Sequence, residues 1–304
     1  MEYVLETNAL CKQYKHFKAL DNLNMHIPKG AIYGFVGKNG AGKTTLIRVI
    51  TGLQNPTSGE YEIYGIGNTD KSIAQSRRRM GAVVETPAVY LDMTANDNMK
   101  TQYRIMGIPS FDGIDKLLSL VGLSDTGNKK AKNFSLGMKQ RLGIAVALAG
   151  NPDFLVLDEP MNGLDPEGIV EIRELILKLN REMGITVLIS SHILDELSRI
   201  ATHYGFIDSG HIVKEISADE LECSCTKKTV VTVTDIQAFV RALDRLGLSY
   251  RVTGDETVEI YDSISVSALS EAAKSESCAI LSLHEQEESL ESFYLNLIGG
   301  ERHA

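Results

Sequence analysis

The most informative stretch of the 304-residue sequence is Gly37-Lys38-Asn39-Gly40-Ala41-Gly42-Lys43-Thr44. It follows an alternating apolar segment at 31–36, which predicts a strand, and it opens a helical pattern at 44–51. In the spacing G-x-x-x-x-G-K-[ST], the glycines let the backbone curl so that its N–H groups point at phosphate oxygens, and the helix N-terminus adds a partial positive charge. The strand before it and the helix after it argue against a chance glycine-rich turn. The stretch therefore predicts a phosphate-binding loop.

The residues of this loop are the candidate ligands of a nucleoside triphosphate and its Mg²⁺ ion. Lys43 would neutralise phosphate charge, and Thr44 would bind Mg²⁺ through its hydroxyl. The candidate phosphate-binding residues are Gly37, Asn39, Gly40, Ala41, Gly42, Lys43, Thr44 and Thr45. A P-loop GTPase or kinase is one alternative, but the N-K-x-D motif that reads guanine is absent from the sequence.

Two adjacent carboxylates, Asp158 and Glu159, follow the apolar run at 154–157. The run predicts a buried strand, and successive side chains at a strand end point in different directions, so the two carboxylates can take separate roles. We expect Asp158 to bind the metal and Glu159 to act as the base toward the attacking water. By itself such a pair is also common in a solvent-facing turn.

The remaining patterns predict an α/β protein in two domains. Alternating segments at 3–10 and 20–27 predict further strands, 71–150 is mostly helical by pattern, and 168–182 is an amphipathic helix before a second buried strand at 186–190. A closing hairpin is expected over 204–215, and the polar junction 217–228 separates domain 1–220 from domain 221–304. The pattern of the second domain predicts a small α+β unit of the split βαβ type.

The charge of the chain is concentrated in its second domain. Residues 221–304 carry seven basic and fourteen acidic side chains, a net charge of −7 out of −9 for the whole chain. A nucleic-acid partner needs clustered Lys and Arg, so this balance predicts none.

The segment Asn133-Phe134-Ser135-Leu136-Gly137-Met138-Lys139-Gln140-Arg141 resembles the L-S-G-G-Q signature of ABC transporter nucleotide-binding subunits. Phe134, Leu136 and Met138 depart from that signature, whereas Ser135 and Gly137 match it. The resemblance covers residues 1 to about 215. It implies an antiparallel β subdomain, a parallel-sheet core and a helical subdomain, followed here by the small α+β domain.

The resemblance also implies how the site is assembled. In the family two copies hold two ATP molecules head to tail, so Ser135 and the Gly137 backbone would serve the nucleotide of a second copy. Tyr14 matches the aromatic residue that stacks on adenine, and Asp165 matches an acidic position in the loop at the dimer interface. His192 matches the histidine that contacts the γ-phosphate and positions the attacking water.

One departure points to a subfamily. The family normally has Gln in the loop that leads to the helical subdomain, whereas this chain has Glu85, which could accept a hydrogen bond or bind Mg²⁺ but cannot donate as an amide does. The chain is most similar to bacitracin-resistance and lantibiotic-immunity ATPase subunits. By that resemblance we expect an exporter of a peptide antibiotic or a similar amphiphile.

The expected membrane component is a separate permease. The longest apolar stretch, 142–150, is about half of the ~20 residues that a spanning helix needs. We therefore expect a cytoplasmic protein that lies on the inner face of the membrane through its permease. Glu85 and residues 86–107 would transmit the closure of the ATP-bound dimer to that permease. A soluble ABC-type ATPase acting on a non-membrane target is the alternative, and a non-catalytic regulatory subunit is less favoured because Lys43 and Glu159 are both present.

Overall fold

The computed structural model describes residues 2–224, 227–287 and 290–300. Its internal contacts divide the chain into two units, Met1–Ala218 and Asp219–Ala304. The division lies two residues before the domain boundary placed at 220 from the sequence.

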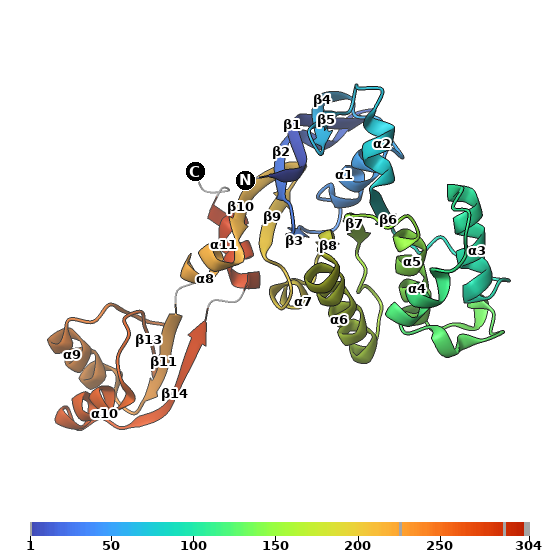
Figure 1. Ribbon diagram of the computed structural model, residues 1–304. Helices are drawn as coiled ribbons and strands as arrows, with labels where there is room; N and C mark the ends of the chain where they lie inside the picture. The colour runs from blue at the N-terminus through green and yellow to red at the C-terminus, as the bar shows by residue number, and fades with distance from the viewer. Residues whose placement is uncertain (1, 225–226, 288–289, 301–304) are drawn as a thin grey trace. The chain divides into compact units, whose positions relative to one another are not determined.

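The first unit contains an antiparallel sheet with the strand order β2-β1-β4-β5 (Figure 1). Its strands are β1 (Tyr3–Tyr14), β2 (Phe17–Pro28), β4 (Ser58–Ile63) and β5 (Ile66–Gly67). Sequence patterning predicts β1 and β2 but misses β4 and β5. Only Tyr61 and Ile63 of β4 are buried, so the alternation in that strand is too short to stand out.

A six-stranded sheet forms the centre of the same unit, with the order β10-β9-β3-β8-β7-β6. Its strands are β3 (Ile32–Val36), β6 (Met80–Val83), β7 (Phe154–Asp158), β8 (Thr186–Ser191), β9 (His203–Asp208) and β10 (His211–Ser217). The expected parallel pairing of β7 with β8 and the expected β9–β10 hairpin are confirmed. The helical prediction is wrong at 80–83, where four residues pair with β7 as a parallel strand. A segment of this length has no readable period, and its pairing with a distant strand decides its conformation.

Helices cover the central sheet and form a lobe beside β6 (Figure 1). They are α1 (Lys43–Ile50), α2 (Ile73–Arg78), α3 (Ala95–Met106), α4 (Ile114–Leu120), α5 (Leu136–Leu148), α6 (Pro166–Met183) and α7 (Leu194–Ser198). Buried apolar residues of α1, including Leu46 and Ile50, join one core with both sheets. None of the helices in the described part of the chain has the length and apolar character to cross a membrane.

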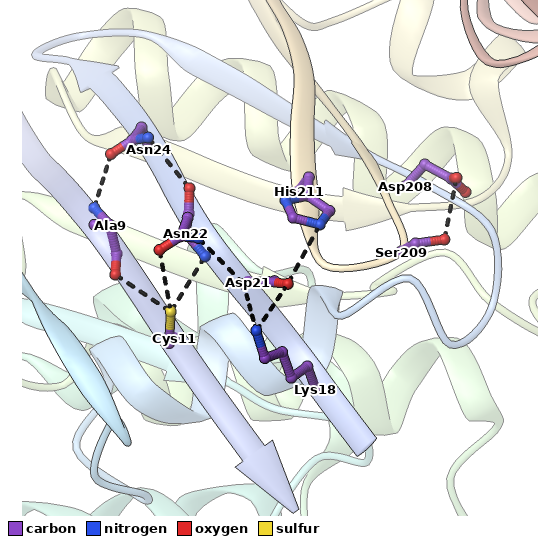
Figure 2. A network of polar contacts seen from close by, with 9 residues as sticks. All are labelled: Ala9, Cys11, Lys18, Asp21, Asn22, Asn24, Asp208, Ser209 and His211. Carbon is purple, nitrogen blue, oxygen red and sulfur yellow. Dashed lines mark hydrogen bonds and ion pairs between the residues drawn. The ribbon is translucent and has the colours of Figure 1, made fainter. Parts of the chain in front are cut away.

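A polar network ties the antiparallel sheet to the turn between β9 and β10 (Figure 2). Asp21 on β2 pairs with Lys18 at 3.2 Å and with His211 Nε2 at 3.7 Å. The backbone N–H of Asp21 donates to the Gly210 carbonyl at 3.0 Å, and the Gly210 N–H donates to the Ala41 carbonyl at 2.9 Å. The β9–β10 turn therefore connects the antiparallel sheet to the phosphate-loop sequence.

The second unit is an α+β sandwich with the strand order β12-β13-β11-β14. Its elements are α8 (Ala218–Ser224), which begins at the last residue of the first unit, β11 (Lys227–Val233), α9 (Ile236–Leu246), β12 (Tyr250–Val252), β13 (Thr257–Ile260), α10 (Val266–Ser275), β14 (Ile280–Glu287) and α11 (Leu290–Gly300). The core of this unit is built from α9, α10 and the sheet, including Phe239, Leu269 and Val231. The split βαβ prediction is confirmed, except that the expected first residue of the last helix, Ser289, lies outside the described residues.

Candidate functional site

The loops after three neighbouring parallel strands meet at one edge of the central sheet. Strand β3 leads into the loop 37–42, β7 leads into Glu159, and β8, which lies between them, leads into His192. Parallel strands place all their carboxyl ends at the same edge, so residues far apart in the sequence come together there. A cavity of about 280 Å³ lies here, lined by Phe17, Ala19, Asn39, Gly40, Gly42, Lys43, Thr44, Thr45, Glu159 and Asn162.

Two glycines of the loop are required by its backbone path. Gly42 has φ 116° and approaches the Ala19 carbonyl so closely that a Cβ atom would overlap it. A Cβ on Gly37 would lie 2.6 Å from the Ile207 carbonyl oxygen. Because an L side chain fits neither position, the loop keeps its curled conformation only with glycine there.

The Lys43 side chain lies within the loop and is 5% exposed. Its ammonium donates to the Gly37 carbonyl at 2.6 Å and lies 3.2 Å from Glu159 Oε1. A buried cation beside the loop backbone is placed to neutralise phosphate charge.

Glu159 and His192 are hydrogen-bonded to each other. The Nδ1 atom of His192 lies 2.7 Å from Glu159 Oε2, so Glu159 bridges His192 and Lys43 through its two carboxylate oxygens. The backbone of Glu159 has φ 50°, which is uncommon for a residue with a side chain. Three of the predicted side chains thus form one continuous polar chain, which combines a proton acceptor with an imidazole that holds it in place.

The residues predicted to bind Mg²⁺ offer the right donor atoms. Thr44, which carries a hydroxyl, is among the residues that line the cavity, and Asp158 is a buried carboxylate at the end of β7. Mg²⁺ prefers oxygen ligands and usually combines one or two protein groups with water and substrate phosphates. Within the described ranges no cluster of three His, Cys, Asp or Glu side chains could hold a metal by itself. The donor set therefore fits an ion that arrives with the nucleotide.

Tyr14 and Glu85 do not line this cavity. The Tyr14 hydroxyl donates to the Gln54 side chain, while Phe17, its register partner across the β1–β2 hairpin, lines the cavity and is 59% exposed. Glu85 is ion-paired with Arg48 of α1 and has φ 59°. Sequence reasoning placed both residues at the nucleotide, and the structure gives each of them another polar partner.

Ser135, Gly137 and Asp165 form a second cluster, apart from the residues that line the cavity. Ser135 caps α5 by accepting the Met138 N–H at 3.2 Å, and Asp165 caps α6 by accepting the Gly168 N–H at 3.1 Å. A Cβ on Gly137 would lie 3.9 Å from the Gly168 Cα, so these two helix ends are neighbours. The first-turn N–H groups of both helices have no acceptor within their own helix, and they give each end a partial positive charge.

Sequence reasoning missed several residues at the site. Phe17 and Ala19 line the cavity, yet their position in a strand resembles that of any hairpin residue. Asn162 also lines it, three residues before the predicted Asp165, and was not among the predicted site residues. Ser190 lies in an apolar run, where only its polarity among buried neighbours could have drawn attention to it.

Comparisons with known proteins show which proteins this chain resembles. A family model described as ABC transporter matches residues 20–162. The chain is 40% identical to the bacitracin transport ATP-binding protein BcrA of Enterococcus faecalis, over 99% of this chain and 98% of that protein. It is 43% identical to the lantibiotic transport ATP-binding protein SrtF of Streptococcus pyogenes, over 72% of this chain and 93% of that protein.

Among solved structures, the chain is similar to a dimeric ATP-binding cassette in a post-hydrolysis state bound to ADP and phosphate. The TM-score is 0.64 at 27% identity, and the match covers 70% of this chain and 98% of that one.

Proposed function

The chain belongs to the ABC transporter family as an ATP-binding, ATP-hydrolysing subunit, and we propose that it works as a homodimer that drives a separate membrane permease. The observation that carries the catalytic part of this proposal is the polar chain from Lys43 through Glu159 to His192, which lies at the phosphate loop. This combination of a buried cation and a paired carboxylate suits attack of water on a terminal phosphate.

In the proposed reaction each member of the chain has a separate task. Lys43 exchanges its contact with the Gly37 carbonyl for phosphate oxygens. Glu159 accepts the proton of the attacking water, and His192 holds Glu159 in place and contacts the γ-phosphate. Thr44 and Asp158 would hold Mg²⁺, and the ion would neutralise charge on the phosphate oxygens.

The second cluster supports the dimer. Ser135 and Gly137 lie at the N-terminus of α5, which is suited to an anion, and Asp165 lies beside them at the start of α6; none of the three lines the cavity of its own chain. We assign this helix end to the triphosphate of a second copy, an isologous arrangement with two composite sites. The similarity to a cassette described as dimeric favours the same assignment.

The peripheral contacts of the nucleotide complete the proposal. We assign the nucleobase to Tyr14 together with Phe17, because the two rings are register partners and Phe17 lines the cavity. Glu85 would join the metal site only after its ion pair with Arg48 opens. That exchange would link nucleotide binding to the loop that leads to α3.

The permease and the cargo are proposed from the relatives. Proteins described as bacitracin and lantibiotic transport ATP-binding proteins share 40% and 43% identity with this chain. We propose that the chain lies at the inner face of the membrane through a permease subunit, contacts it through Glu85 and residues 86–107, and drives export of a peptide antibiotic or similar amphiphile.

Substitution of the base tests the catalytic assignment. Glu159→Gln should reduce ATP turnover by about 10²- to 10⁴-fold, the usual contribution of a positioned base. It should still bind MgATP and accumulate as a dimer, because the amide removes the base but keeps the volume of the side chain. Turnover is measured by phosphate release, and dimerisation by sedimentation velocity with and without MgATP.

The matched control for this experiment is Glu259→Gln in the second unit, which removes a carboxylate paired with Lys228. It should leave turnover unchanged. Wild-type turnover in Glu159→Gln would remove the base assignment, and an inactive variant that stays monomeric with MgATP would contradict the dimer.

A further inference from the structure

The two acidic residues at the end of β7, Asp158 and Glu159, are both hydrogen-bonded to one residue of the neighbouring strand. Ser190 on β8 is the register partner of Asp158 and is completely buried. Its hydroxyl donates to Asp158 Oδ1 at 2.6 Å and accepts the backbone N–H of Glu159 at 2.9 Å. The Ser190 carbonyl accepts the same N–H at 3.2 Å. One serine is therefore bonded to two consecutive residues that have separate proposed roles.

The hydrogen bond to Asp158 sets the direction of a carboxylate that is 1% exposed. A carboxylate has two oxygens that accept hydrogen bonds, and a donor on one of them fixes the rotation of the group about its terminal bond. With Oδ1 bonded to Ser190, Oδ2 is the oxygen that remains to face a metal. The length of the Ser190–Asp158 bond, 2.6 Å, lies in the range typical of hydrogen bonds from a hydroxyl to a carboxylate.

The hydrogen bond to Glu159 holds an unusual backbone conformation. Glu159 has φ 50°, in the left-handed region, where residues other than glycine persist only when their surroundings hold them. This turn of the backbone directs the side chain toward Lys43 at 3.2 Å and His192 at 2.7 Å. Without the Ser190 hydroxyl, the turn would rely on the longer bond to the Ser190 carbonyl.

We propose that Ser190 is a positioning residue for ATP hydrolysis, because it orients Asp158 and holds the backbone turn from which Glu159 reaches His192 and Lys43. The proposal rests on the roles assigned above to Asp158 and Glu159. The effect of Ser190 passes through the Asp158 carboxylate and the Glu159 backbone, and it needs no contact between Ser190 and the nucleotide.

The next residue provides a matched control. Ser191 is also buried, at 6% exposure, but among the described residues its hydroxyl bonds to the backbone of Ile193 instead, whose N–H it accepts at 2.9 Å and whose carbonyl lies at 3.3 Å. Ser190→Ala and Ser191→Ala remove the same atom from consecutive positions of one strand. Only the first removes a bond to Asp158 and Glu159.

The test compares three variants of the full chain: Ser190→Ala, Ser190→Cys and Ser191→Ala. Ser190→Ala should lower kcat by about ten- to a hundredfold, the effect of losing a hydrogen bond to a charged group, while KM for ATP changes by less than about threefold. Ser190→Cys keeps the volume but has a weak donor, so its kcat should fall between those of wild type and Ser190→Ala. Ser191→Ala should keep kcat within about twofold of wild type.

Hydrogen exchange of the nucleotide-free chain gives a readout that does not depend on turnover. The Glu159 amide should exchange at least about tenfold faster in Ser190→Ala than in wild type, since its N–H loses the closer of two acceptors. The same amide should be unchanged in Ser191→Ala. Ser190→Cys keeps both measurements available if Ser190→Ala does not fold.

Two results would overturn the positioning role: a kcat for Ser190→Ala within twofold of wild type, or an equal loss in Ser191→Ala. The Glu159→Gln experiment separates this failure from that of the proposed function. If Glu159→Gln loses turnover and Ser190→Ala does not, only the role of Ser190 is wrong. If Glu159→Gln keeps turnover, the base assignment itself fails.

Discussion

The two units of this chain contain similar elements, strands covered by helices, but they place their charged residues differently. In the first unit, β3, β8 and β7 are parallel neighbours, and their carboxyl ends bring Lys43, His192 and Glu159 together. In the second unit the neighbouring strands β11, β12, β13 and β14 are paired antiparallel throughout. There Lys228 on β11 and Glu259 on β13 form an ion pair at 2.6 Å between neighbouring strands.

The difference shows why one sheet can form a reactive site where the other forms an ion pair. Antiparallel neighbours end at opposite edges, so their terminal loops separate. Parallel neighbours end at one edge, and each contributes a loop to the same place. Whether charged groups from several strands meet in one site therefore depends more on the direction of those strands than on the number of charged groups.

The largest effect that sharpens this comparison is expected from the two lysines. Lys43→Ala should weaken ATP binding by about a hundredfold, because a buried, charge-assisted contact to phosphate is lost. Lys228→Ala should leave the affinity unchanged to within about twofold. Titration of each variant with a fluorescent ATP analogue measures its nucleotide affinity. A similar loss in the two variants would show that the second unit takes part in nucleotide binding.

A smaller effect is expected from two serines that have the same structural role. Ser135 and Ser265 cap α5 and α10, accepting N–H groups at 3.2 and 3.3 Å. Aspartate is as good a cap as serine, so Ser135→Asp and Ser265→Asp should both preserve the fold. Ser135→Asp should weaken MgATP-dependent dimerisation about tenfold or more, since its carboxylate would face the phosphates bound by the other copy.

Sedimentation velocity in the Glu159→Gln background measures this difference, with Ser265→Asp as the control. Unchanged dimerisation in Ser135→Asp would contradict the assignment of that helix end to a second nucleotide.

The smallest effect concerns the pH dependence of the second unit. The hydrogen bond from Lys228 lowers the pKa of Glu259 below its ordinary value. A group with a lowered folded pKa adds stability above its unfolded pKa, and that stability is lost as the pH falls through the folded pKa. Lys228→Ala should therefore destabilise this unit by about 1 kcal/mol or less at pH 7, since the pair is partly exposed.

The difference between wild type and Lys228→Ala should shrink as the pH falls below about 5, where the unfolded carboxyl takes up its proton. Urea unfolding followed by methyl NMR signals of Val231 and Val258, both in the core of this unit, measures it. A difference that stays constant down to pH 3 would show that Lys228 stabilises the unit through packing rather than charge.

Much of the site could be predicted because its chemistry lies in short continuous stretches. The loop 37–44 follows β3, and the pair Asp158-Glu159 stands at the end of β7. The apolar pattern of each strand is visible in its own residues. Prediction failed at β6, whose four residues are a strand only because β7 lies beside them. It also missed the Arg48–Glu85 ion pair, which joins the end of α1 to a loop more than thirty residues away.

The local pattern of residues 31–51 is sufficient to specify a strand, a glycine loop and a helix, because backbone direction there depends on neighbouring φ and ψ values. The meeting of Lys43, Glu159 and His192, and the bond from Ser190 to Asp158, depend instead on the parallel register of β3, β8 and β7. Register is settled only when whole strands bury their apolar faces together, since a shift of one residue would turn every side chain to the opposite face. For that reason the individual reactive residues could be predicted from the sequence, whereas the contacts between them are decided only by the assembled sheet.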